Sequence, residues 1–388
     1  MKKKLCMLLA LLLVVTTLGA CGNGAAPAST ASASASGGNP TDKTPIKVAV
    51  AGPLTGNYSE YGIGFDAACK IMVDKWNKDG GINGRPIELL SYDEKSSTEE
   101  GLAIAQLLCG EDNFYGVVGH FSASMAVGTL YTEERVPLIS ASSSSAGFTG
   151  QGDCCFRLNA TISTETMGML ECAKTAGKTK LGVVYLNNDW GRNAYDNLKT
   201  LLQEKGNEDW EIVDAEEIAG GDMDYNAVIS NLNAAGAETA IMFCYYDSVV
   251  PFTIKARTVM PDLNIVCGVN CYNDTFLKVG GKDVEGCMAP SVFAAVSDDP
   301  DVKYFVDEYK ARTTQVPSSL TAQAYDAMGV LLTAIAENNG ELDKEAILKS
   351  IQNNDYKGVT GSCSFSENRD ATRNFSPMVV SNGQWIYY

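Results

Sequence analysis

From Ile46 onward, short runs of apolar residues alternate with longer stretches in which apolar residues recur every three or four positions. The first run, residues 46–51, is short and apolar except for Lys47, which is typical of a buried strand. Next come Ala68, Met72 and Trp76 at helical spacing, and Gly80-Gly81 closes that segment. The pattern predicts one strand followed by one helix.

The same alternation continues along the chain. Further buried strands are expected at residues 87–92, 115–118, 137–140, 181–186, 211–214, 239–244 and 263–267. Helical stretches separate most of them, notably at residues 99–108, 123–134, 164–176, 192–205 and 225–235. Strands that alternate with helices form parallel sheets covered on both faces, and small ligands bind beyond the carboxyl ends of such strands. The predicted class is α/β, and a length of 388 residues favours two lobes over one core.

The first 20 residues have the pattern of an export signal. Lys2-Lys3-Lys4 precede an uncharged apolar run, residues 5–18, that is too short to span a bilayer as a mature helix. The run ends in Leu18-Gly19-Ala20-Cys21, which resembles the bacterial lipobox. We therefore expect a signal peptide at 1–20, lipidation of Cys21 and an extracytoplasmic protein anchored to the outer face of the cell membrane. The alternative is plain secretory cleavage beside a chance cysteine.

Residues 21–44 are rich in alanine and serine, with an alternating Ala-Ser run at 29–36 followed by Gly37-Gly38. Such a composition buries too little apolar surface to offset the entropy of ordering. The sequence predicts a disordered tether between the lipid and the folded part.

The charge balance excludes whole classes of partner. The chain has 30 Lys plus Arg against 47 Asp plus Glu, a net charge of −17, and loss of residues 1–20 would remove three lysines and no acid. This acidity opposes binding to nucleic acid and keeps the body away from an anionic membrane surface. His120 is the only histidine, which excludes sites that need two imidazoles. No metal or cofactor is expected.

The cysteines do not reveal a disulfide framework. Ten remain when Cys6 and Cys21 are set aside, and Cys154 and Cys155 are adjacent. Their spacing fits no small disulfide-rich domain, so the sequence leaves both disulfides and buried free thiols open.

The sequence contains no convincing motif of a known enzyme class. Residues 62–67, from Gly62 to Ala67, match the dinucleotide fingerprint formally, but about ten residues separate them from the preceding strand, which should lead directly into such a turn. We interpret these small residues as the packed start of a helix. No nucleophile elbow or P-loop occurs, and His120 is interpreted as a hydrogen-bonded structural residue. A secreted hydrolase with a carboxylate pair needs no motif and remains an alternative.

Two loops rich in hydroxyl groups follow neighbouring predicted strands. One is residues 119–124, which contains Ser122 and Ser124, and the other is residues 141–147, with Ser142 and Ser144. Both loops precede expected helix starts, so their hydroxyl and N–H groups would suit a small anion such as a carboxylate. The alternative is that these serines only cap helices.

A series of short segments between residues 46 and 388 follows the pattern of one known family. They include IKVAVAGPLTG at 46–56, GGINGRPIEL at 80–89, VPLIS at 136–140 and AYDA at 324–327, with shorter matches at 61–62, 92–93, 190–191, 245, 267–268 and 285–286. In these segments the chain resembles the branched-chain amino acid binding proteins of ABC importers, the Leu/Ile/Val-binding type.

The resemblance implies the type I periplasmic-binding fold, in which two lobes, each a mainly parallel sheet flanked by helices, are joined by three hinge crossovers. It implies an N-terminal lobe of residues 46–162 plus 294–374 and a C-terminal lobe of 163–293 plus 375–388. It also implies a binding protein without catalytic activity that captures a small amino acid, branched-chain or otherwise apolar, in the cleft and delivers it to an ABC permease and ATPase complex. The alternative of the same fold is a receptor that reports its ligand to a membrane signalling partner.

The family's binding residues can be carried over to this chain. The resemblance places Ser142 and Ser144 where the family binds a ligand carboxylate, aided by a hydroxyl on the preceding loop, here Ser122 or Ser124. It places three aromatic side chains around the cleft, namely Tyr61, Trp190 and Tyr245.

One departure from the family leaves the ligand open. Where the Leu/Ile/Val type presents an acid to the ligand ammonium, this chain has Asn270. An ammonium buried without a carboxylate is costly. Three alternatives remain: Asp247 or Asp274 supplies the charge, Asn270 and aromatic faces meet the ammonium, or the ligand is not a standard α-amino acid.

Overall fold

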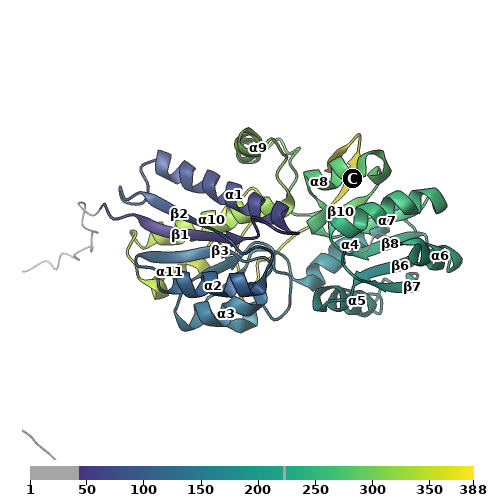
Figure 1. Ribbon diagram of the computed structural model, residues 1–388, viewed down its shortest axis with the longest axis horizontal. Helices are drawn as coiled ribbons and strands as arrows, with labels where there is room; N and C mark the ends of the chain where they lie inside the picture. The colour runs from purple at the N-terminus through teal and green to yellow at the C-terminus, as the bar shows by residue number, and fades with distance from the viewer. Residues whose placement is uncertain (1–42, 222–223) are drawn as a thin grey trace, which may run out of the picture. The chain divides into compact units, whose positions relative to one another are not determined.

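A computed structural model describes residues 43–221 and 224–388, which belong to one compact unit (Figure 1). The predicted signal peptide, Cys21 and all but the last two residues of the predicted tether lie outside the described residues. Among the described helices, none combines the length and the apolar character that crossing a bilayer requires.

The first sheet has five parallel strands in the order β2-β1-β3-β4-β5. They are β1 (Ile46–Gly52), β2 (Ile87–Asp93), β3 (Phe114–Gly119), β4 (Leu138–Ser140) and β5 (Cys155–Arg157). Successive side chains of a strand point to opposite faces. Accordingly Val48 and Val50 join the core beneath α1 (Ser59–Lys78) and α10 (Ser319–Glu337), whereas Ala49 and Ala51 join the core beneath α2 (Thr98–Cys109) and α3 (Ser124–Glu133).

The second sheet has seven strands in the order β14-β13-β10-β9-β8-β6-β7. The parallel strands are β6 (Lys180–Leu186), β7 (Glu211–Ile218), β8 (Thr239–Phe243), β9 (Asn264–Cys267) and β10 (Met288–Ser291). The hairpin of β13 (Ser376–Ser381) and β14 (Gln384–Tyr387) adds two antiparallel strands to β10. One face packs on α4 (Ile162–Ala176) and α5 (Asp189–Leu201), the other on α6 (Asn226–Ala234) and α7 (Tyr246–Val259).

The chain passes between the two sheets three times, after β5, after β10 and before β13. Between the last two passages lie α9 (Pro300–Thr313), α10 and α11 (Lys344–Gln352), of which α9 and α10 pack on α1. A short hairpin of β11 (Lys357–Gly358) and β12 (Gly361–Ser362) follows. The predicted fold class is confirmed, since two mainly parallel sheets are each flanked by helices. Both sheets fit within the predicted lobes, but the lobe boundaries themselves stay a prediction.

Gly62 allows α1 to pack directly on the loop that follows β1. A Cβ atom at this position would lie 2.1 Å from the Pro53 carbonyl oxygen, and one at Gly64 would lie 2.4 Å from Thr321 Oγ1. Real Cβ atoms do not approach a backbone oxygen as closely as the one at Gly62 would, so that change requires the helix to shift, whereas a change at Gly64 displaces the Thr321 side chain. The structure therefore confirms that the small residues of 62–67 open a packed helix.

Replacing Gly62 with alanine is expected to lower the free energy of unfolding by about 1–3 kcal/mol, because it overpacks a rigid backbone contact. Chemical denaturation of the ligand-free protein measures this loss. Ile63→Ala is the matched control, since Ile63 is 46% exposed and surface changes usually alter stability by less than about 0.5 kcal/mol. Equal stability of the Gly62→Ala variant and the parent would contradict the assigned contact.

The ten cysteines of the described part are all free thiols. Nine are buried and Cys109, at the end of α2, is partly exposed. Burial raises the pKa of the Cys109 and Cys155 thiols to about 11. They therefore act as small apolar side chains of the two cores.

Candidate ligand-binding site

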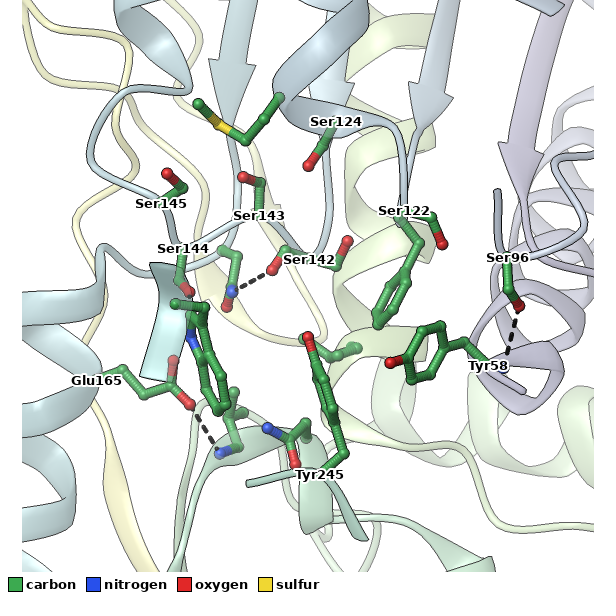
Figure 2. Close-up of a pocket in the computed structure, with 17 residues that line it drawn as sticks. Tyr58, Ser96, Ser122, Ser124, Ser142, Ser143, Ser144, Ser145, Glu165 and Tyr245 are labelled. Atoms are coloured by element: carbon green, nitrogen blue, oxygen red, sulfur yellow. Dashed lines mark hydrogen bonds between the residues drawn. The ribbon is translucent and has the colours of Figure 1, made fainter. Parts of the chain in front are cut away.

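A cavity of about 330 Å³ lies where the loops after both sets of strands meet (Figure 2). Loops after β1, β2, β3 and β4 contribute Tyr58, Ser96 and two serine clusters, and loops after β6, β8 and β9 contribute Trp190, Tyr245 and Asn270. In Figure 2 the labelled serines lie along one side and Tyr245 and Glu165 along the other. Because carboxyl ends of parallel strands are the usual ligand-binding edges, this cavity is the candidate site.

The serine side contains polar groups with unused hydrogen-bonding capacity. Ser122 Oγ is buried without a hydrogen-bond partner among the described residues, and the amide N–H groups of Ser144 and Ser145 donate to none of them. Ser142 and Ser124 also line the cavity. Buried polar groups without a protein partner are rare in native proteins, so these donors are available to a ligand or to water in the cavity.

The loop after β3 is held from behind by a buried network. Glu94 accepts hydrogen bonds from the N–H groups of Phe121 and Ser122, and its second carboxylate oxygen lies 3.0 Å from His120 Nδ1. His120 Nε2 lies 2.9 Å from the Tyr131 hydroxyl, which confirms the structural interpretation of His120. The two N–H groups bound by Glu94 are therefore not available to a ligand.

The serines are not helix caps. Helix α3 begins after Ala123, which makes no side-chain cap, and a single 3₁₀ turn, η1 (Thr149–Gln151), follows the second serine loop instead of the expected helix. The helix-capping alternative is therefore wrong for both loops, and so is the expected helix start after the second loop. What presents the second loop is Asn159, whose side-chain amide donates to the Ser142 carbonyl at 2.9 Å.

Trp190 joins the serine side to the aromatic side. It lies in the first turn of α5, its Nε1 donates to Ser144 Oγ at 3.1 Å, and its ring stacks on Tyr245 with centroids 5.3 Å apart. Since the Ser144 hydroxyl accepts this bond, its own proton remains available to a ligand in the cavity.

Of the predicted aromatic residues, Tyr61 does not line the cavity. It is 2% exposed and lies one layer back, stacked on Phe121 with a centroid distance of 4.8 Å, and its hydroxyl donates to the Asn270 carbonyl at 3.4 Å. Tyr58 and Phe121 form the surface that faces the cavity from the first sheet. The other seven predicted ligand-binding residues all line it, namely Ser122, Ser124, Ser142, Ser144, Trp190, Tyr245 and Asn270.

Glu165 is the acid at this cavity, and the sequence did not single it out. It lies in the first turn of α4, is 4% exposed and accepts the Val269 N–H at 3.1 Å. Burial raises the pKa of its carboxyl to about 7. The acids proposed from the sequence lie elsewhere: Asp247 is exposed and outside the lining, and Asp274 pairs with Lys278 at 2.6 Å.

Acidic and metal-ligating side chains are scarce among the described residues that line the cavity. Glu165 is its one acid among the described residues, whereas glycosidase chemistry uses two carboxyl groups. No group of three or more metal-ligating side chains occurs in the described ranges 43–221 and 224–388.

The profile of the family described as "Periplasmic binding protein" matches residues 45–384. The chain belongs to the periplasmic binding protein family. The resemblance found in the sequence is thereby confirmed.

Relatives of this periplasmic binding protein cover nearly its whole folded part. The leucine-, isoleucine-, valine-, threonine- and alanine-binding protein of Pseudomonas aeruginosa is 27% identical over 333 residues, covering 84% of this chain and 87% of that protein. The Leu/Ile/Val-binding protein homolog 3 of Brucella melitensis is 22% identical over 331 residues, covering 84% and 88%. These relatives are named as binding proteins and not as enzymes.

Solved structures share the fold at low identity. A branched-chain amino acid transporter substrate-binding protein from Streptococcus pneumoniae, in complex with isoleucine, has a TM-score of 0.80 at 24% identity and covers 88% of this chain and 98% of its own. A solute-binding protein from R. palustris, in complex with benzoate, has a TM-score of 0.79 at 16% identity and covers 88% and 95%. One fold thus accommodates both an amino acid and a simple aromatic carboxylate.

Proposed function

We propose that this chain is the extracytoplasmic solute-binding lipoprotein of an ABC importer and that it captures a small amino acid in the cavity between its two sheets. The observation that carries the proposal is the pairing of unpartnered serine donors on one side with a stacked aromatic pair on the other. In this proposal the serines bind the ligand carboxylate and the aromatic rings exclude water around the apolar part.

The ligand also couples the two lobes, for which we retain the boundaries 46–162 plus 294–374 and 163–293 plus 375–388. One ligand molecule can contact both Ser144 and Asn270 only when the loops after the first sheet lie close to those after the second. The ligand therefore favours that arrangement by its differential affinity, and a permease and ATPase complex can distinguish loaded from empty protein. The predicted lipid on Cys21 keeps this cycle next to the membrane.

A thermal-shift screen over the amino acids tests the proposal. A ligand present at about 100 times its dissociation constant stabilises the folded state by about 2.7 kcal/mol, so at least one amino acid should raise the melting temperature clearly. Calorimetry then measures stoichiometry and affinity. If no amino acid raises the melting temperature, amino-acid capture is refuted.

Replacing Ser144 with alanine is expected to weaken amino-acid binding by about 1–3 kcal/mol, since it removes a hydroxyl that bonds to a charged group. Titration calorimetry of the parent and the variant measures the change. Ser362→Ala is the control, because Ser362 is exposed and lies outside the cavity. Identical affinities of the Ser144 variant and the parent would remove the serine loop from the proposed site.

A further inference from the structure

Glu165 lies where a ligand cation would be balanced. One of its carboxylate oxygens accepts the Val269 N–H at 3.1 Å, and no described residue donates a hydrogen bond to the other. The side chain is 4% exposed and reaches the cavity from α4. A carboxylate so placed has lost most of its water without gaining a second partner, which is costly unless a ligand supplies one.

No cation among the residues that the structure describes balances this carboxylate. The lining residues among the described part include no Lys, Arg or His, and no ion pair of a described residue involves Glu165. The groups that face it are neutral: Trp190 on α5, Asn270 on η2 (Val269–Cys271), the serines of the first sheet and Tyr245, whose pKa is raised by burial. The cavity therefore presents neutral donors at one end and a single negative charge at the other.

Glu165 lies beside Asn270, the position at which the family resemblance implies an acid. A Cβ atom on Gly268 would lie 2.9 Å from Glu165 Oε1 and 3.2 Å from Asn270 Nδ2, so the two side chains flank the same glycine. The Glu165 carboxylate, which comes from α4, can therefore bind a ligand cation at the end of β9. It supplies the negative charge that the neutral side-chain amide of Asn270 does not.

We propose that Glu165 is the counter-ion of the ligand ammonium group and that the cavity thereby selects monocarboxylate zwitterions over carboxylates that lack an ammonium. The proposal rests on the proposed function, because it assigns the second pole of the same site. The ligand carboxylate lies at Ser122 and Ser144, its ammonium at Glu165, and its apolar part against Tyr58 and Phe121.

The two ligand classes have opposite linkage to protons. Burial raises the pKa of Glu165 to about 7, so the empty site is partly protonated at neutral pH. An ammonium favours the ionised carboxylate, so binding of a zwitterion releases a proton and strengthens as the pH rises from about 6 to 8. A carboxylate without an ammonium favours protonated Glu165, so its binding weakens over the same range.

The experiment is titration calorimetry of the full chain in buffers of different ionisation enthalpy, between pH 6 and 8. The probes are whichever apolar amino acid raises the melting temperature most and its analogue without the amino group, for example L-leucine with 4-methylpentanoate. For the parent we expect proton release with the amino acid and weaker binding of the analogue. Glu165→Gln should weaken the amino acid at least about tenfold, abolish the proton release and leave the analogue no weaker.

Glu171→Gln on the same helix is the matched control, because Glu171 is exposed and pairs with Lys174 at 2.8 Å. It should change neither affinity nor proton release. The melting temperature of the ligand-free Glu165→Gln protein shows whether this variant is folded. If it is not, the proposal is still tested by the parent protein, through its proton release and its preference for the amino acid over the analogue.

The outcomes separate this inference from the proposed function. An amino acid that binds the parent without proton release, or that binds Glu165→Gln as tightly, overturns the role of Glu165 and leaves amino-acid capture standing. Binding of the carboxylate analogue but of no amino acid overturns both.

Discussion

Replacing Trp190 with alanine is expected to weaken amino-acid binding by about 2–4 kcal/mol, roughly 30- to 700-fold. Trp190 stacks on Tyr245, and its N–H donates a hydrogen bond that orients the Ser144 hydroxyl. Its replacement by alanine therefore removes an aromatic ring from the cavity lining and leaves the Ser144 hydroxyl without the group that orients it. Large aromatic side chains at the centre of a contact usually dominate its energy. Calorimetry with the amino acid found in the screen measures the loss.

The ligand-free variant should lose no more stability than a matched tryptophan variant, because Trp190 is partly exposed at the edge of the cavity. Trp76 is the matched control: like Trp190 it is partly exposed and packs on the core, but it does not line the cavity. Trp76→Ala should lower stability and spare affinity. The reverse pattern would place the ligand away from Trp190.

The largest loss of stability is expected at Asp326 in α10. Its fully buried carboxylate accepts the N–H of Val359 at 3.0 Å, the N–H of Thr360 at 2.8 Å and the Thr360 hydroxyl at 2.5 Å. Asp326→Ala leaves three buried donors without an acceptor, each costing about 1–3 kcal/mol before relaxation. We expect a decrease of about 3–5 kcal/mol in the free energy of unfolding, measured by denaturant titration.

Asp326→Asn keeps one acceptor oxygen and should lose less. Burial raises the pKa of Asp326 to about 6, above its value in the unfolded chain, so the folded state holds this proton more tightly. The stability that Asp326 contributes relative to asparagine is thus fully present below about pH 4 and declines as the pH rises through about 6. A stability difference between parent and Asp326→Asn that is constant from pH 4 to 7 would contradict this assignment.

The sequence predicts those elements whose environments leave a simple pattern. The strand at 46–51 is apolar except for the partly buried Lys47 because its other residues are buried, and α1 shows an apolar stripe because it has one buried face. Helix α10 has no such stripe, since nearly every residue from Ser319 to Ile335 is buried. A helix buried all round lacks the polar face on which a periodicity argument depends.

The sequence pattern also fails to identify two residues of the cavity, Glu165 and Tyr58, because only tertiary packing sets them apart from their neighbours. Glu165 follows the N-cap Thr161 and lies in the first turn of α4, where an acid is ordinarily favoured by the helix dipole, so nothing in the pattern distinguishes it from a surface residue. Tyr58 and Tyr61 are three residues apart at the start of α1, and only the packing decides which of them faces the cavity. The serine loops were found because their positions after two adjacent strands follow from the alternation itself.

The free thiols of the two cores also bear on how this protein can be produced. Because no cystine links the described residues, their folding does not depend on an oxidising compartment or on thiol-oxidising catalysts. Recombinant protein made in a reducing bacterial cytosol should therefore acquire the same fold as exported protein, and dithiothreitol can be kept in every buffer without loss of ligand capture.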